Sequence, residues 1–383
     1  MSDLVLRVDK PAHGGSCVGR SDGRVVFCRH SLPGEMVAAQ VTGESSRFLR
    51  ADAIEVLANP NPARRASPCE WFGPGLCGGC SWLHAEPEEQ RRLKEQVLAE
   101  TLQRIAGISR EPVVIPLGLE RGWRTRMTLH ADPTGRLGLH TSRSDHIVAV
   151  GDCLQAAPEL DLPELLERRW PPGAEVRVSV SDAGRAVMAV QADGRRQIEG
   201  VEEHLYVVGG RQFACSTDGF WQSHTLAPAT LVDEVRTLVE PARTIVDLYA
   251  GVGLFGLSLL DEHVEQMVLV EGDRRAAAFA RRNAAGDPRV RVIGSDVRRW
   301  RPSGADLVVL DPPRAGAGGK VVSAIAGSGA ATIVYVSCEP STLARDLGLF
   351  ADHGYRPDHI RGFDLFPGTA HVETVVRLRK EST

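Results

Sequence analysis

The C-terminal half of the chain alternates short apolar runs with segments in which apolar residues recur every three or four positions. Short apolar runs are typical of buried strands, and the periodic segments are typical of amphipathic helices. Their alternation predicts an α/β fold with a doubly wound parallel sheet. Strands are expected at 245–249, 267–271, 290–293, 307–311 and 333–337, and helices at 254–260, 274–284, near 320–327 and at 341–351.

The first part of the chain has a different pattern, in which short apolar stretches are separated by glycine-containing turns. About five short strands in under 60 residues predict a small β-barrel of the OB type. Because a fold does not determine a function, two interpretations stay open for this segment. It is either a generic small barrel or an accessory module that binds RNA.

A proline-rich linker at 59–62 separates the barrel from a central region. A helix is expected there from about Pro87 to Ile105, with charged residues on its solvent faces. Strands mixed with turns follow from about 112 to 210, which predicts an antiparallel arrangement. The sequence therefore divides into three expected domains, at 1–58, 59–210 and 211–383.

Composition narrows the class of protein. The 383 residues are 43% hydrophobic and 25% charged, as in globular proteins that fold in water. The net charge of −4 gives no global basic field, although a local basic patch can still bind nucleic acid. The chain shows no secretory signal and no apolar run of the ~20 residues that span a membrane, so a cytoplasmic location is expected. The eight cysteines are then expected as metal ligands, catalytic groups or core thiols.

The strand expected at 245–249 runs into a glycine-rich turn containing Gly251 and Gly253. Glycines there allow a ligand to approach the backbone closely. Glu271 ends the next strand, where an acidic side chain suits a ribose diol, and Asp296 follows the third strand. This order resembles class I methyltransferases, which bind S-adenosylmethionine. The alternative is a flavodoxin-like sheet without a nucleotide.

Cys338 is delivered to the carboxyl end of an apolar strand, the edge of an α/β sheet where ligands bind. It is either a nucleophile or an ordinary half-buried thiol. As a nucleophile it would add to C6 of a uracil and make C5 reactive toward a methyl donor. A base must then remove the C5 proton, and Glu373 fits that role unless it is a surface carboxylate. Asp311 would hold the base edge or orient the cofactor.

Three segments together resemble the RNA uridine-5 methyltransferase family, which makes 5-methyluridine in tRNA and ribosomal RNA. They are Asp-Pro-Pro-Arg at 311–314, the run 337–347 and the run 364–373. The resemblance covers most of the chain, including the barrel, which is similar to the TRAM module of this family. It implies Cys338 as nucleophile and Glu373 as base. Positions on the cofactor side are Gln222, Tyr249, Gly251, Leu254, Glu271, Asp296 and Asp311. Two positions depart from the family pattern, His224 and Leu254.

A second group of cysteines lies in a glycine-rich loop, where Cys69, Cys77 and Cys80 form a C-x7-C-x2-C pattern. Cys153 is the candidate fourth ligand. Four thiolates suit zinc or an iron–sulfur cluster, and the spacing favours neither. The resemblance implies a 4Fe-4S cluster, as in the 23S ribosomal-RNA branch of the family, with a structural role. The remaining thiols, Cys17, Cys28 and Cys215, are expected in cores.

Contact with RNA is expected at residues 121–126, where Trp123 lies between arginines that suit phosphates and a stacked base. The alternative is a solvated strand face. The expected activity is methyl transfer to C5 of a uridine, in ribosomal RNA rather than tRNA, with the base flipped out of its stack. A cytosine-5 or amino methyltransferase and a non-catalytic RNA-binding protein are the other possibilities, although no second cysteine stands beside the Pro-Pro loop. The sequence indicates no membrane contact and no obligate protein partner.

Overall fold

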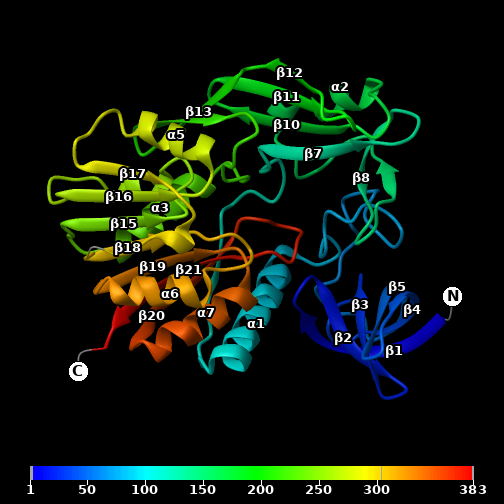
Figure 1. Cartoon of the computed structure of the whole chain (residues 1–383). Coiled ribbons are helices and arrows are strands. Elements are labelled where there is room, and N and C mark those ends of the chain that lie inside the picture. The colour runs from blue at the N-terminus through cyan, green and yellow to red at the C-terminus, as the bar shows by residue number, and fades with distance from the viewer. Residues whose placement is uncertain (1–2, 303, 382–383) are drawn as a thin grey trace.

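The computed structural model describes residues 3–302 and 304–381 and begins with a closed five-stranded barrel, drawn in blue in Figure 1. Its strands pair in the order β1-β2-β3-β5-β4. Alternate side chains fill its core, among them Leu6, Val8 and Val37. The expected small barrel is therefore confirmed. The strands are β1 (Asp3–Ala12), β2 (Ser16–Ser21), β3 (Arg24–Arg29), β4 (Met36–Glu44) and β5 (Phe48–Ala58).

The central region contains a six-stranded antiparallel sheet in the order β12-β11-β10-β7-β8-β9, as the turn-rich pattern predicted. A short helix, α2 (Leu162–Glu167), packs against it, and a two-stranded hairpin of β13 (Glu203–Val208) and β14 (Arg211–Ser216) follows. The six strands are β7 (Arg126–Ala131), β8 (Leu137–His140), β9 (Ile147–Ala149), β10 (Glu175–Ser181), β11 (Gly184–Val190) and β12 (Arg196–Gly200).

The C-terminal sheet has eight strands in the order β17-β16-β15-β18-β19-β21-β20-β6. The expected parallel sheet is confirmed only for the first five, because β21 lies antiparallel to both β19 and β20. The sheet is therefore mixed. Its strands are β15 (Thr244–Leu248), β16 (Gln266–Glu271), β17 (Val290–Gly294), β18 (Leu307–Leu310), β19 (Thr332–Ser337), β20 (Tyr355–Asp364), β21 (Glu373–Lys380) and β6 (Val114–Pro116).

Helices cover both faces of this sheet, and each face has its own apolar core. One face packs against α3 (Ala227–Leu238), α4 (Leu254–Ser258) and α5 (Arg274–Asn283). The other packs against α6 (Gly318–Gly327), α7 (Pro340–Asp352) and α1 (Pro87–Ala106), which lie side by side in Figure 1.

Helix α1 belongs to the expected central domain at 59–210, yet it packs against α7. It starts with Pro87 and two acidic residues in its first turn, and Gly107 ends it in the left-handed conformation. Strand β6 then joins the large sheet beside β20. Residues between the barrel and the six-stranded sheet therefore form part of the C-terminal layer. Within the described ranges, none of the helices combines the length and apolar character needed to span a bilayer.

Candidate active site

The pairing of β19 with β21 brings the two expected catalytic residues to one edge of the sheet. Ser337 lies opposite Thr374 in this antiparallel ladder. Cys338 directly follows Ser337, and Glu373 directly precedes Thr374, so both stand at the same end of the ladder. Cys338 is half-buried, whereas Glu373 is only 4% exposed.

Two further polar residues meet this pair. Asp311 follows β18, the other neighbour of β19, and Nε2 of Gln222 donates to its Oδ2 at 3.4 Å. Burial raises the pKa of Cys338 to about 11, and the charges of Glu373 and Asp311 add to the effect. Arg314 acts in the opposite direction. The structure thus brings together four of the residues singled out in the sequence, with Arg314 beside them.

The two carboxyl groups of this site, of which Glu373 is buried and Asp311 is partly buried, are shifted toward their neutral forms. Burial raises the pKa of Asp311 to about 7. Burial also raises the pKa of Glu373 well above its ordinary value, and the charge of Asp311 raises it further. Carboxyl groups whose pKa values are raised in this way are stronger bases than ordinary carboxylates once they ionise. Such a pair in a partly open site can accept and hold a proton near neutral pH.

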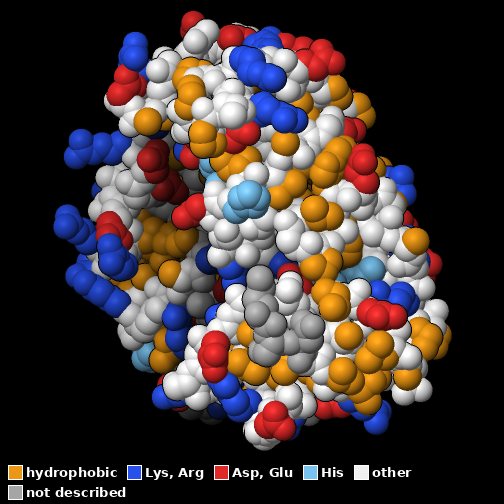
Figure 2. Space-filling view, turned by 90° about the vertical axis from the view of Figure 1, so that its right-hand side faces the viewer, with side chains coloured by type: hydrophobic (Ala, Val, Ile, Leu, Met, Phe, Trp, Pro, Cys, Tyr) orange, Lys and Arg blue, Asp and Glu red, His pale blue; other side chains and the backbone are white. Residues whose placement is uncertain are grey.

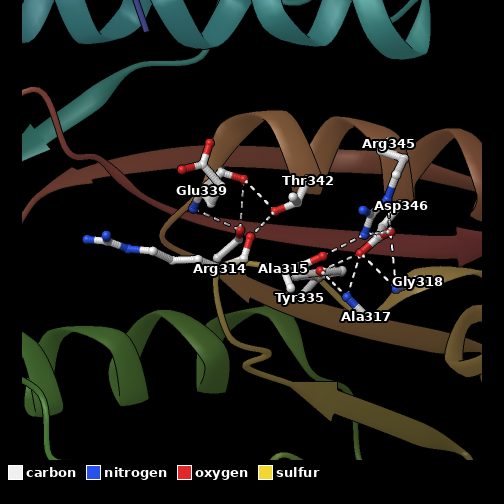
Figure 3. A network of polar contacts seen from close by, with 10 residues as sticks. Arg314, Ala315, Ala317, Gly318, Tyr335, Glu339, Thr342, Arg345 and Asp346 are labelled. Carbon is white, nitrogen blue, oxygen red and sulfur yellow. Dashed lines mark hydrogen bonds and ion pairs between the residues drawn. The ribbon is translucent and has the colours of Figure 1, made fainter. Parts of the chain in front are cut away.

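A polar network fixes the loop that carries Asp311 and Arg314 against α7 (Figure 3). Asp346, which is fully buried, accepts hydrogen bonds from the backbone N–H of Ala317 at 2.7 Å and from the hydroxyl of Tyr335 at 2.8 Å. The Thr342 hydroxyl donates to the carbonyl of Arg314 at 3.0 Å. The Arg314 side chain points away from these contacts in Figure 3. Because α7 begins two residues after Cys338, the network also fixes the position of the loop relative to Cys338.

The glycine-rich turn lies at the same edge of the sheet. Gly251 has φ +56°, and open space surrounds the position where a side chain would stand. Its N–H donates to Oε2 of Glu271 at 2.8 Å. Tyr249 has φ +60° and lies just beyond β15, so the expected strand at 245–249 ends one residue early because its last residue turns out of the sheet. Leu254 is buried as the first residue of α4.

The strand ends beside this turn carry the remaining expected cofactor residues. Glu271 pairs with Gly294 at the ends of β16 and β17, and Asp296 follows two residues later. Asp296 caps a short helical turn and forms an ion pair with Arg298, which lowers its pKa to about 2. Carboxylates and a glycine turn along neighbouring parallel strands form the kind of edge that holds a nucleoside.

The second group of cysteines is electrostatically linked. Burial has the largest effect on the pKa of Cys80, and the thiols of Cys153, Cys77 and Cys69 lie close enough to raise it further.

Donors point at two of these sulfurs. The N–H of Gly79 donates to Cys77 Sγ at 3.4 Å, and Nε2 of Gln155 donates to Cys80 Sγ at 3.6 Å. Burial raises the pKa of Cys80 to about 12, so without a cation the group would stay protonated. A cluster of soft ligands with donors to sulfur fits a metal centre in its chemistry. Among the described residues, however, no three His, Cys, Asp or Glu side chains are arranged to hold a single metal ion.

The expected RNA contact at 121–126 is wrong in one respect. Trp123 is 2% exposed and stacks on His224, so it is not available to a base. Arg124, Arg126 and Arg177 instead line an open cavity of about 230 Å³. The molecule is also hollowed on the left of the face in Figure 2, where Lys and Arg side chains gather along the outer edge of the hollow. Cys17, Cys28 and Cys215 are buried, as expected of core thiols.

Sequence reasoning missed a contact between the barrel and the site. Nε2 of His13, at the tip of the β1–β2 hairpin, lies 3.3 Å from Oε1 of Glu339, the residue after Cys338. A Cβ added to Gly15 would lie 2.4 Å from Cβ of Ser81 and 3.2 Å from Cβ of Ala370. The hairpin tip therefore touches both the cysteine loop and the segment before Glu373. In the sequence, Gly14 and Gly15 indicate only that a turn lies here and give no sign of the contact.

The fold and site define an α/β methyltransferase domain joined to a small barrel. The Methyltransferase small domain family matches residues 222–328, the TRAM domain family matches 4–54, and the tRNA (Uracil-5-)-methyltransferase family matches 290–381. An uncharacterized RNA methyltransferase of Streptomyces coelicolor is 40% identical over 97% of this chain and 92% of its own length. The 23S rRNA (uracil(1939)-C(5))-methyltransferase RlmD of Alkalilimnicola ehrlichii is 31% identical over 97% and 95%. The chain belongs to the RNA (uracil-5-)-methyltransferase family.

A solved structure supports the fold. The Pyrococcus abyssi tRNA (uracil-54, C5)-methyltransferase in complex with S-adenosyl-L-homocysteine superposes with a TM-score of 0.73. The superposition covers 98% of this chain and 100% of that one, at 22% sequence identity. The barrel, the central region and the large sheet therefore occur together in that chain as well.

Proposed function

We propose that this S-adenosylmethionine-dependent RNA (uracil-5-)-methyltransferase works through Cys338 as nucleophile and Glu373 as base. The observation that carries the proposal is the β19–β21 register, which places the two residues at one end of a ladder. Asp311 and Gln222, joined by a hydrogen bond, would hold the polar edge of the uracil. Tyr249, Gly251, Leu254, Glu271 and Asp296 would form the cofactor side of the site.

The chemistry follows from these positions. The Cys338 thiolate adds to C6 of the flipped uracil, and the C5–C6 electron pair moves to form an enolate. Bound S-adenosylmethionine supplies the electrophilic methyl group that C5 takes up. Glu373 then removes the remaining C5 proton, the C5–C6 double bond re-forms, and the thiolate leaves C6.

One experiment tests the assignment of Cys338 as nucleophile. RNA containing 5-fluorouridine should trap a covalent adduct on the wild-type enzyme, because fluorine cannot leave as a proton. Cys338→Ala should give no adduct and no methyl transfer while binding S-adenosylmethionine as tightly as the wild type. Methyl transfer by Cys338→Ala at the wild-type rate would contradict the proposal.

Ribosomal RNA is the substrate we infer, because a relative with 31% identity across nearly its full length is a 23S rRNA enzyme. A tRNA is the second candidate, because the family that matches 290–381 is described as acting on tRNA. Mapping 5-methyluridine in both RNAs from cells with and without the gene separates the two.

We infer a cytoplasmic location for the enzyme, because its eight free thiols fit a reducing compartment.

We also propose that Cys69, Cys77, Cys80 and Cys153 hold a 4Fe-4S cluster. Their mutual proximity and the donors to Cys77 and Cys80 support this proposal. A cluster has several metal atoms, so its ligands stand farther apart than the ligands of one zinc ion. Bound cluster iron would supply the positive charge that keeps the thiols ionised. Assay of iron, sulfide and zinc in anaerobically purified protein tests the proposal, and stoichiometric zinc without iron would overturn it.

A further inference from the structure

The segment that leads into Glu373 is held by residues from outside the large sheet. After β20 the chain runs through residues 365–372 before β21 begins. The carbonyl of Gly368 accepts hydrogen bonds from the N–H groups of Ser81 and Trp82 at 2.8 and 2.9 Å. The N–H of Gly368 donates to Oε1 of Gln90 on α1 at 2.7 Å. Both backbone polar groups of Gly368 are thus used by the cysteine loop and α1.

Gln155 adds the contact that joins this segment directly to a cysteine sulfur. Its Nε2 donates to the carbonyl of Pro367 at 3.0 Å and to Cys80 Sγ at 3.6 Å. The residue is 3% exposed, and its Oε1 has no hydrogen-bond partner among the described residues. Because the buried amide oxygen has no partner, the two hydrogen bonds that Nε2 donates determine the orientation of the amide. Turning the amide over would put its oxygen against the Pro367 carbonyl.

The space around Gly368 shows how closely these parts fit. Gly368 has φ +78°, and a Cβ added there would lie 2.7 Å from Leu83 and 2.8 Å from Nε2 of Gln155. Pro367 and Gly368 therefore fit against the cysteine loop in only one position. Residues Thr369 to Val372 connect this packed position directly to Glu373. Displacement at Pro367 or Gly368 is transmitted to the base through a few residues of chain.

We propose that Gln155 is a positioning residue that couples the Cys80 loop to Glu373. It acts on the step in which the C5 proton is removed, because only in that step does the Glu373 carboxylate touch the reacting atoms. Addition of Cys338 to C6 depends on β19 and α7, which Gln155 does not contact. The inference rests on the proposed role of Glu373 as base.

Two variants of similar size test the proposal in the full-length enzyme that retains its cysteine-bound metal. Gln155→Met removes both donors, and Gln155→Glu replaces them with acceptors. A misplaced catalytic group costs up to about 100-fold in rate, so kcat should fall about 10- to 100-fold with KM changed less than about twofold. Methylated RNA should accumulate as a covalent adduct with Cys338 on denaturing gels, even with ordinary uridine. Gln197→Met, an exposed glutamine on β12, is the matched control and should behave as the wild type.

The outcomes separate this proposal from its alternatives. Loss of iron in parallel with activity would mean that Gln155 serves metal retention, which would overturn the proposal. A fall in kcat without adduct, or an unchanged kcat, would overturn it as well. The 5-fluorouridine adduct on the wild-type enzyme is measured alongside. Its absence would refute covalent addition by Cys338, and with it the proton-removal step assigned to Glu373, so the two failures are distinguishable.

Discussion

Ser337 and Thr374 face each other in the β19–β21 ladder, and this one pair sets the relative positions of Cys338 and Glu373. The antiparallel direction of β21 is essential to the arrangement. In a parallel pairing, the start of β21 would lie at the opposite edge of the sheet from the end of β19. The reversal instead brings the start of β21 to the end of β19. Glu373, the first residue of β21, therefore lies at the same edge as Cys338, which directly follows β19.

The reactivity of Cys338 should rise with pH and should depend on Glu373. Burial and the carboxylates raise the pKa of Cys338 to about 11, so the thiol is neutral at pH 7 in the free enzyme. Glu373→Gln removes a carboxyl group whose ionised form disfavours the thiolate and should lower this pKa, whereas Arg314→Ala should raise it. The measurement is the rate of alkylation of Cys338 by iodoacetamide as a function of pH, with Cys338→Ala as background. An alkylation profile that is the same in all three proteins would contradict the described electrostatics.

The buried ion pair between α1 and β20 should be important for stability. Lys94 Nζ lies 2.5 Å from Oδ1 of Asp364 and also donates to the carbonyl of Phe366 at 3.1 Å. Lys94→Met leaves Asp364 as a buried charge without its partner, which costs about 3–5 kcal/mol of unfolding free energy. Adding Asp364→Leu should recover much of the loss. Urea denaturation followed by tryptophan fluorescence measures both, and additive losses in the double variant would contradict the pairing.

The contact of the barrel hairpin with the site can be tested with two glycines that share a backbone conformation. Gly15 has φ +84° and no room for a side chain, whereas Gly23 has φ +77° and nothing within 4 Å. Alanine at either position costs about 1 kcal/mol in backbone strain. Only Gly15→Ala should also displace Ser81 and Ala370, so only this variant should lower kcat/KM for RNA. S-adenosylmethionine binding should be unchanged in both. Equal loss of RNA methylation in the two variants would show that backbone strain, not the contact, is responsible.

Local pattern predicted the strands and helices of the large sheet well because buried parallel strands are continuous apolar runs. The direction of β21 left no local signal, since pairing partners are chosen by tertiary contacts. Lys94 was expected on a solvent face of α1, yet it is buried against Asp364, which lies 270 residues away in the sequence. Trp123 was expected to meet a base, yet His224 and Phe366 cover it. Both errors concern contacts between distant segments.

The residues of the candidate site were predictable where motif and strand end coincide. Cys338 and Asp311 follow apolar runs, so their positions at the carboxyl edge could be deduced. Gln155 and His13 carry no such signal, because each makes its contacts with residues of distant segments. His13 meets Glu339 only after the barrel has packed against the large sheet.

Asp346 should be necessary for holding the Asp-Pro-Pro-Arg loop, although it touches none of the reacting groups. It is fully buried, and it accepts hydrogen bonds from the N–H groups of Ala317 and Gly318 and from the Tyr335 hydroxyl. Asp346→Ala leaves these donors without an acceptor, which costs about 1–3 kcal/mol for each buried group that stays unpaired. The loop should then loosen, and methyl transfer should fall more than binding of S-adenosylmethionine.

A matched control for this variant lies on the same helix. Asp352→Ala removes an exposed carboxylate at the end of α7 and should leave stability and activity near wild type. Tyr335→Phe removes one donor to Asp346 and should have a smaller effect than Asp346→Ala, because the backbone donors keep their acceptor. Denaturation curves and initial rates of methylation give both orders. If Asp346→Ala and Asp352→Ala behaved alike, the network in Figure 3 would not be what fixes the loop.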